Sequence, residues 1–198
     1  MGGKSSKKKV KRPTILSILA IGNSMAGKTA LINCYKGMKF DPSAVSTIAN
    51  EFELFHKVLK DDKNEVAKVK VKMWDSPGQE RFESIVVNAL QNTQGIFLVY
   101  DTTNKQSFND LQTWINRVNK YKDISSFPFI LIANKIDLVN ERQISQEECK
   151  EFAEKNKMPY FETSAKSGQG VKEAINSLIS RVFNANTQEP SSTFVVTN

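Results

Sequence analysis

The chain has 198 residues, of which 39% are hydrophobic and 25% charged, as expected for one globular domain with a substantial core. No apolar run reaches transmembrane length, and the N-terminus lacks the pattern of a signal peptide. The two cysteines, Cys34 and Cys149, lie in helix-like segments and predict free thiols in the cytosol rather than a disulfide framework.

The formal charge of +7 is distributed unevenly along the chain. Residues 1–12 contain six lysine and arginine residues and no acid, which leaves about +1 for the remainder. This distribution argues against nucleic acid as a partner, because the basic character belongs to a tail and not to a folded surface. We expect a disordered basic segment over residues 1–12, a folded domain over 13–186 and a flexible polar tail over 187–198.

The predicted elements alternate between strands and helices. A buried strand is expected over residues 14–21, a helix over 28–36, and two alternating strands over 51–59 and 66–73, joined by a polar turn. There follow a strand over 95–100, a helix over 107–121, a strand over 127–133, a capped helix from Ser145, a strand over 159–162 and an amphipathic helix over 171–183. This order predicts an α/β fold with an open, mostly parallel sheet, whose ligands bind at the carboxyl ends of the strands.

The segment between the first strand and the first helix, GNSMAGKT at residues 22–29, matches the phosphate-loop pattern G-x-x-x-x-G-K-[ST]. Its backbone N–H groups would surround the phosphates, Lys28 would reach the terminal ones, and the Thr29 hydroxyl would contact Mg²⁺. The pattern also occurs by chance, so it needs support from other motifs. We expect nucleotide contacts from Asn23, Ser24, Met25, Ala26, Gly27, Lys28, Thr29 and Ala30.

Three further segments follow predicted strands. They are DSPGQ at residues 75–79, NKID at 134–137 and SAK at 164–166. The Asp75 carboxylate could hold Mg²⁺ through water, although an isolated aspartate before Pro77 could also be a turn former. Asp137 could accept hydrogen bonds from the N1–H and exocyclic amine of guanine, a donor pair that adenine does not offer. Backbone N–H groups of the third segment could reach the guanine O6. The base contacts are expected from Asn134, Lys135, Asp137, Ser164, Ala165 and Lys166.

Together these motifs resemble those of the Ras superfamily of small GTPases, and within it the Rab family. The resemblance covers about residues 14–183. It also includes the segments STI at 46–48, WDSPGQERF at 74–82, LVYDTT at 98–103, SFNDLQTW at 107–114 and FETSAK at 161–166. It implies a P-loop NTPase small G-domain, with helices on both faces of its sheet, that binds GTP or GDP with Mg²⁺. It further implies GTP hydrolysis and a role as a molecular switch in membrane traffic or signalling.

The resemblance also assigns roles to single residues. Thr47 matches the threonine of the first switch, which binds Mg²⁺ and senses the γ-phosphate, and Phe40 matches the aromatic residue that packs against guanine. Gly78 matches the glycine whose N–H meets the γ-phosphate, and Gln79 matches the residue that orients the attacking water. Thr29, Thr47 and Asp75 would surround the metal. The switch regions with Thr47 and Gln79 would bind an exchange factor, a GTPase-activating protein and effectors.

Some positions differ from the usual Rab sequence. Asn23, Met25 and Ala26 replace aspartate, glycine and valine, Ala49 replaces glycine, and Ser76-Pro77 replaces threonine-alanine. Pro77 has a fixed φ and no N–H directly before Gly78, which would slow hydrolysis. A pseudo-GTPase that binds nucleotide with little hydrolysis therefore remains an alternative. A P-loop kinase or ATPase is disfavoured by the two guanine motifs.

The termini predict attachment to a membrane through the N-terminus. Rab proteins normally end in prenylated cysteines, whereas this chain ends in TFVVTN, so prenylation is not expected. The first six residues, MGGKSS, fit N-myristoylation at Gly2, and the adjacent basic residues would supply the second membrane signal. A solubilising tail and a nuclear-localisation run are the alternatives. We expect a peripheral protein on the cytosolic leaflet, and no other surface is expected to attract the membrane.

Overall fold

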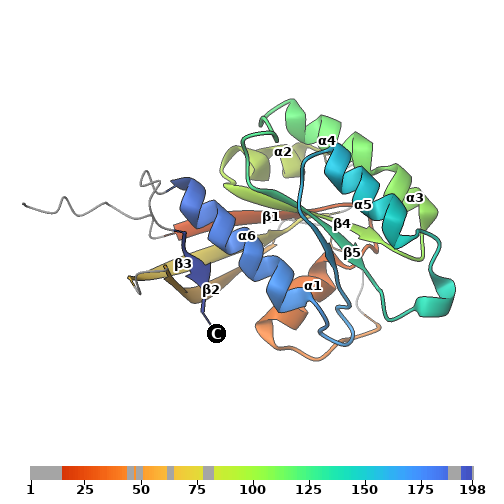
Figure 1. Ribbon diagram of the computed structural model, residues 1–198, viewed down its shortest axis with the longest axis horizontal. Coiled ribbons are helices and arrows are strands. Elements are labelled where there is room, and N and C mark those ends of the chain that lie inside the picture. The colour runs from red at the N-terminus through yellow and green to blue at the C-terminus, as the bar shows by residue number, and fades with distance from the viewer. Residues whose placement is uncertain are drawn as a thin grey trace, which may run out of the picture.

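The computed structural model describes residues 15–43, 47, 51–61, 65–77, 83–186 and 193–197 (Figure 1). The strands are β1 (Ile15–Ile21), β2 (Glu51–Lys60), β3 (Val66–Asp75), β4 (Gly95–Asp101), β5 (Phe129–Asn134), β6 (Tyr160–Glu162) and β7 (Val195–Val196). The helices are α1 (Lys28–Lys36), α2 (Glu83–Gln91), α3 (Lys105–Asn109), α4 (Leu111–Asn119), α5 (Gln146–Lys155) and α6 (Val171–Asn186), with a 3-10 helix η2 (Val139–Glu141).

The strands form one sheet with the order β6-β5-β4-β1-β3-β2-β7. β1 is parallel to β3 and β4, and β5 is parallel to β4 and β6, whereas β2 is antiparallel to β3 and β7. The predicted α/β class with a mostly parallel sheet is therefore confirmed. Because five strands run in the same direction, the loops that follow β1, β3, β4, β5 and β6 meet at a single edge.

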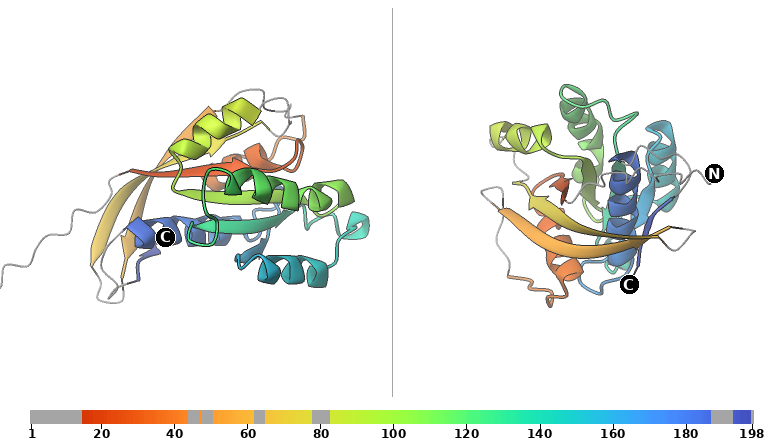
Figure 2. Two further views of the ribbon diagram at one scale, coloured as in Figure 1. Left: turned by 90° about the horizontal axis from the view of Figure 1, so that it is seen from above. Right: turned by 90° about the vertical axis from the view of Figure 1, so that its left-hand side faces the viewer.

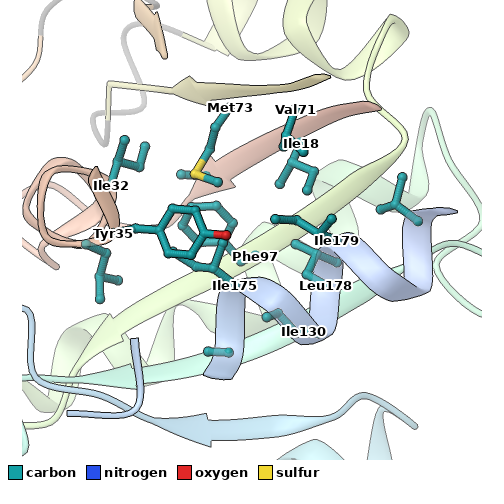
Figure 3. Close-up of a cluster of buried hydrophobic side chains, with 14 of the residues drawn as sticks. Ile18, Ile32, Tyr35, Val71, Met73, Phe97, Ile130, Ile175, Leu178 and Ile179 are labelled. Atoms are coloured by element: carbon teal, nitrogen blue, oxygen red, sulfur yellow. The ribbon is translucent and has the colours of Figure 1, made fainter. Parts of the chain in front are cut away.

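Helices cover both faces of the sheet and make two hydrophobic clusters (Figure 2). One cluster packs α1 and α6 on the sheet around Tyr35, Phe97 and Ile175, which Figure 3 shows in close contact. The other packs α2, α4 and α5 on the opposite face around Tyr100 and Trp114. β4 and β5 are buried on both faces, so they are continuous apolar runs, whereas β3 alternates between buried and exposed side chains.

Local signals explain most element boundaries. Gly37 ends α1 with a left-handed φ of 89°. The predicted capping box of α5 is present, with the Ser145 hydroxyl accepting from the Glu148 N–H and the Glu148 carboxylate accepting from the Ser145 N–H. The helix predicted over 107–121 is instead two helices, because the Asn104 side chain caps α3 early and α4 begins after Asp110. No helix among the described residues is long and apolar enough to cross a membrane.

The prediction of a flexible C-terminal tail is wrong for residues 193–197. β7 pairs with the end of β2, with Val195 opposite Lys60 and Val196 opposite Leu59. Phe194 is only 4% exposed, and its ring lies 5.0 Å from that of Phe183 on α6. Phe194, Val196 and an available strand edge hold this short segment. The mostly polar composition of residues 187–198 as a whole concealed its apolar residues Phe194, Val195 and Val196.

Candidate functional site

The phosphate-loop segment turns sharply between β1 and α1 because two glycines allow close approaches. Gly22 has φ 135°, and an added Cβ would lie 2.1 Å from the carbonyl oxygen of Val99. Gly27 has φ 96°, and an added Cβ would lie 2.2 Å from the Asn134 side-chain nitrogen. Neither position accepts a side chain, so the backbone of the loop lies directly against β4 and the last residue of β5.

Lys28 is buried at the start of α1 and faces back into this loop. Its Nζ donates hydrogen bonds to the carbonyl oxygens of Gly22 and Asn23, at 3.0 and 2.9 Å. Burial lowers the pKa of the Lys28 ammonium to about 8, and the charge of Asp75 opposes that shift. A buried cation at a helix N-terminus, with carbonyl oxygens as its hydrogen-bond partners, is stabilised by a bound anion such as phosphate.

Three oxygen-bearing side chains meet beside Lys28 at the end of β3. Asp75 Oδ2 accepts hydrogen bonds from the hydroxyls of Thr29 and Thr47, at 2.5 and 3.1 Å, and the two hydroxyls lie 2.9 Å apart. Asp75 Oδ1 is buried and has no hydrogen-bond partner in the described part of the chain. Burial raises the pKa of the Asp75 carboxyl, against the hydrogen bond from Thr29 and the charge of Lys28.

This cluster fits a small divalent cation. A buried carboxylate oxygen without a donor is costly, and a cation would satisfy it. Mg²⁺ prefers oxygen ligands and is usually held by one or two carboxylates together with phosphates and water. Among the described residues there is no group of three or more His, Cys, Asp and Glu side chains that could hold a metal by itself. The phosphates and hydroxyls would therefore have to complete any coordination here.

Asn134 joins three loops of the same edge and is itself buried. Its Nδ2 donates to the carbonyl oxygen of Ala26, at 3.0 Å. Its Oδ1 accepts from the Ala165 N–H and the Thr163 hydroxyl, both at 3.2 Å. The side chain thus fixes the phosphate loop relative to the two loops predicted to bind the base.

The expected base-binding groups lie beside it. The exposed Asp137 accepts a hydrogen bond from the buried Ser164 hydroxyl, at 2.6 Å, which orients the carboxylate. Lys135 has a left-handed φ of 67°, and its Nζ lies 2.6 Å from Asp101 Oδ2 at the end of β4. Lys166 follows these groups and is exposed. An oriented carboxylate at the surface can accept paired N–H donors from a planar base.

Asn23 makes a connection that sequence reasoning missed. Its Oδ1 accepts from the Trp114 indole N–H at 2.7 Å, and its Nδ2 donates to Asp110 Oδ2 at 2.6 Å. An aspartate in place of Asn23 would set two carboxylates against each other, so the amide suits the neighbouring Asp110. The only sequence signal was the departure at Asn23 itself, since Asp110 and Trp114 lie in the SFNDLQTW segment that resembles the family.

The remaining predicted residues are placed as follows. Met25 has a left-handed φ of 63° and is 64% exposed, a conformation that costs about 1 kcal/mol or more for a residue with a Cβ. Phe40 is exposed on the chain after α1. The buried Ser76 hydroxyl donates to the carbonyl oxygen of Ala20, which anchors the segment before Pro77. Ser24 and Ala26 lie in the phosphate loop and Ala30 in α1, whereas Gly2, Ala49, Gly78 and Gln79 lie outside the described residues.

Comparison with known proteins agrees with this geometry. A model of the Ras family matches residues 17–184. The chain is 36% identical to Ras-related protein Rab-18 of Lymnaea stagnalis over 170 residues, which is 86% of this chain and 81% of that protein. It is 36% identical to Ras-related protein Rab-1 of Theileria parva over 178 residues, which is 89% of this chain and 78% of that protein. It is 32% identical to Ras-related protein Rab-27B of Rattus norvegicus over 175 residues, which is 85% of this chain and 80% of that protein.

The family match begins within β1 and ends within α6, so it contains every loop of the site described above. Members of this family are GTPases that bind GTP and GDP with Mg²⁺. Both the family model and the similar proteins lead to the same assignment: the chain belongs to the Ras family, among its Rab-like members.

Proposed function

We propose that this protein binds GTP and GDP with Mg²⁺ at the sheet edge, hydrolyses GTP and acts as a molecular switch in membrane traffic or signalling. The observation that carries the proposal is the cluster beside Lys28. There Asp75 Oδ2 accepts from two threonine hydroxyls, whereas the buried Asp75 Oδ1 has no donor among the described residues. The buried Lys28 ammonium would be stabilised by a phosphate, and the neighbouring buried Asp75 oxygen by a metal ion. The Mg²⁺–nucleotide complex has both.

Thr29, Thr47 and Asp75 would hold the metal, which when bound would neutralise charge on the phosphate oxygens. Lys28 would exchange its carbonyl partners for phosphate oxygens. Since Thr47 belongs to the first switch region and Asp75 lies just before the second, loss of the γ-phosphate would release both segments. Exchange factors, GTPase-activating proteins and effectors would recognise this difference, as partners of Rab proteins do in general.

Asp137 would select guanine. Replacing Asp137 with Asn removes an acceptor for the paired N–H donors, and unpaired buried donors reduce selectivity by orders of magnitude. Competition of GTP, ATP and XTP against a fluorescent guanine nucleotide measures this. Glu141→Gln, which removes an exposed acid on η2 nearby, is the matched control and should keep the preference for GTP. A wild-type protein that prefers ATP would contradict the proposal.

Gln79 would orient the attacking water, and hydrolysis without a partner would be slow. A binding module with little hydrolysis is the second candidate, and it is favoured by Pro77, which is buried directly before Gly78 and has no N–H. Single-turnover phosphate release distinguishes the two functions. A GTPase should lose most of its rate in Gln79→Leu, whereas equal release by wild type and variant would support the binding module.

We also propose that Gly2 carries a myristoyl group and that the basic residues after it bind the cytosolic leaflet. One acyl chain gives only marginal membrane binding, and each basic residue near an anionic surface adds about 1 kcal/mol. Gly2→Ala should therefore shift the protein to the soluble fraction in cells. Retention of the variant on membranes would contradict the assignment. Mass spectrometry of the N-terminal peptide tests the modification directly.

A further inference from the structure

One face of the β2–β3 hairpin collects lysines. Direct cross-strand pairs place His56 beside Lys70, Leu54 beside Lys72 and Lys60 beside Val66. Because alternate residues of a strand share a face, all of these side chains lie on the side away from α1 and α6. The left view of Figure 2 shows this hairpin extending past α2. We call this surface the lysine face, defined by Lys60, Lys68, Lys70 and Lys72.

The lysine face carries uncompensated positive charge. Its described positions on β1, β2 and β3 contain no aspartate or glutamate, and none of its four lysines forms an ion pair with a described residue. The hairpin acid Glu53 points to the opposite side, where it pairs with Lys36 of α1 at 2.6 Å. The near-neutral total after residue 12 therefore conceals a basic surface, so the total charge alone does not support the expectation that no other surface attracts a membrane.

Apolar side chains border the same surface. Ile15, Phe52, Leu54 and Val66 are each about half exposed. Lys72 Nζ lies 3.9 Å from the centre of the Phe52 ring and 4.0 Å from that of Trp74, so its charge remains at the surface above the rings. The face is thus a flat stretch of sheet on which ammonium groups and apolar groups stand side by side.

The sequence just before β1 has the same charge as this surface. β1 begins at Ile15, which pairs with Lys70 of β3. In the sequence Ile15 comes three residues after Arg12, the last of the six basic residues at the N-terminus. The basic N-terminal sequence and a sheet face of the same charge are therefore only a few residues apart along the chain.

We propose that the lysine face lies against an anionic membrane surface, so that the domain is oriented there and not merely tethered. A protein partner is the weaker fit, because lysine is depleted and arginine enriched in protein–protein interfaces, and this face has four lysines and no described arginine. Anionic lipid headgroups instead attract clustered basic residues without needing fixed partners, and exposed apolar groups add to that attraction. The inference goes beyond the nucleotide function, which it does not require.

The test uses full-length GDP-bound protein with Gly2→Ala, so that no acyl chain contributes. Binding to vesicles of phosphatidylcholine, with and without phosphatidylserine, is measured by co-sedimentation at low salt. Lys68→Gln with Lys70→Gln should weaken binding to the anionic vesicles roughly thirty-fold, from about 1 kcal/mol for each charge. The matched control is Lys150→Gln with Lys155→Gln, two exposed lysines on α5 at the β6 end of the sheet.

The outcomes separate the lysine face from the other sources of charge. The proposal is supported if the Lys150 and Lys155 control pair loses less than about five-fold in vesicle affinity, the effect expected for one lysine, while the Lys68 and Lys70 pair loses far more. Equal losses in both pairs would overturn it, because net charge alone would then explain binding. No loss in either pair would also overturn it and leave the N-terminal segment as the only membrane contact. Failure of the Gly2→Ala protein with all its lysines to bind anionic vesicles would overturn the proposal and leave an acidic protein as the occupant. Unchanged GDP affinity in all variants keeps these results independent of the nucleotide site.

Discussion

Phe194 should contribute strongly to the stability of the folded domain, although it lies in a segment whose sequence predicts a loose tail. Its side chain is buried in the cluster between α6 and the sheet, in edge contact with Phe183. The Asn184 side chain makes two hydrogen bonds to the backbone of Phe194. Its Nδ2 donates to the Phe194 carbonyl oxygen at 3.0 Å, and its Oδ1 accepts from the Phe194 N–H at 2.9 Å. The Ser180 hydroxyl accepts from the Val196 N–H, and the Thr197 N–H donates to Val58 of β2.

Phe194→Ala removes a fully packed ring. Such changes in protein cores cost about 3–5 kcal/mol in the free energy of unfolding. In a domain of this size, 1 kcal/mol corresponds to about 2–4 °C, so Tm should fall by roughly 10 °C. Deletion of residues 193–198 should cost at least as much, because the pairing with β2 is lost together with the ring.

Urea unfolding and thermal melts at a fixed excess of GDP and Mg²⁺ measure the loss, since bound ligand shifts both quantities. Val195→Ala is the matched control on the same strand, because Val195 is 53% exposed. Exposed substitutions usually change stability by about 0.5 kcal/mol or less. A loss below about 1 kcal/mol for Phe194→Ala, or one equal to that of the control, would refute the assigned packing.

Three further predictions concern the nucleotide site. Thr29→Asn should lower affinity for GTP more than for GDP, because the hydroxyl beside Asp75 is lost; fluorescent-nucleotide titration measures this, and unchanged GTP loading would contradict the metal assignment. Asn23→Asp should speed GDP dissociation roughly ten-fold, as expected when about 1.4 kcal/mol is lost by placing a carboxylate against Asp110. The double variant with Asp110→Asn restores an amide–carboxylate pair and should recover the rate, whereas additive effects would show that the pair does not act together. Pro77→Ala restores an N–H and should speed single-turnover hydrolysis; an unchanged rate would exclude Pro77 as the cause of slow turnover.

Sequence patterns that act locally predicted their structures well. The continuous apolar runs of β4 and β5 indicate strands covered on both faces, and alternation in β3 indicates a strand covered on one. The capping box at Ser145 also depends on neighbouring residues only. α2 was not predicted and residues 107–121 were merged into one helix, because helix ends depend on individual caps such as Asn104.

The chain order alone determined that the phosphate loop, Asp75, Asn134 and Ser164 come together, because parallel strands deliver their following loops to one edge of a sheet. Only the tertiary structure decided which side chains hold those loops in place. The contacts of Asn23 with Asp110 and Trp114 span about ninety residues of sequence, and no local pattern encodes them.

The same limit applies to the C-terminal strand and the lysine face. Phe194 is buried and Val195–Val196 form a strand only because α6 and the edge of β2 offer packing and hydrogen-bond partners. The alternation of lysines along β3 was visible in the sequence, but strand pairing places Lys60 on the same face and leaves the acid Glu53 on the other. Net charge is a sum over the chain, whereas the potential at a surface depends on which charges the fold brings together.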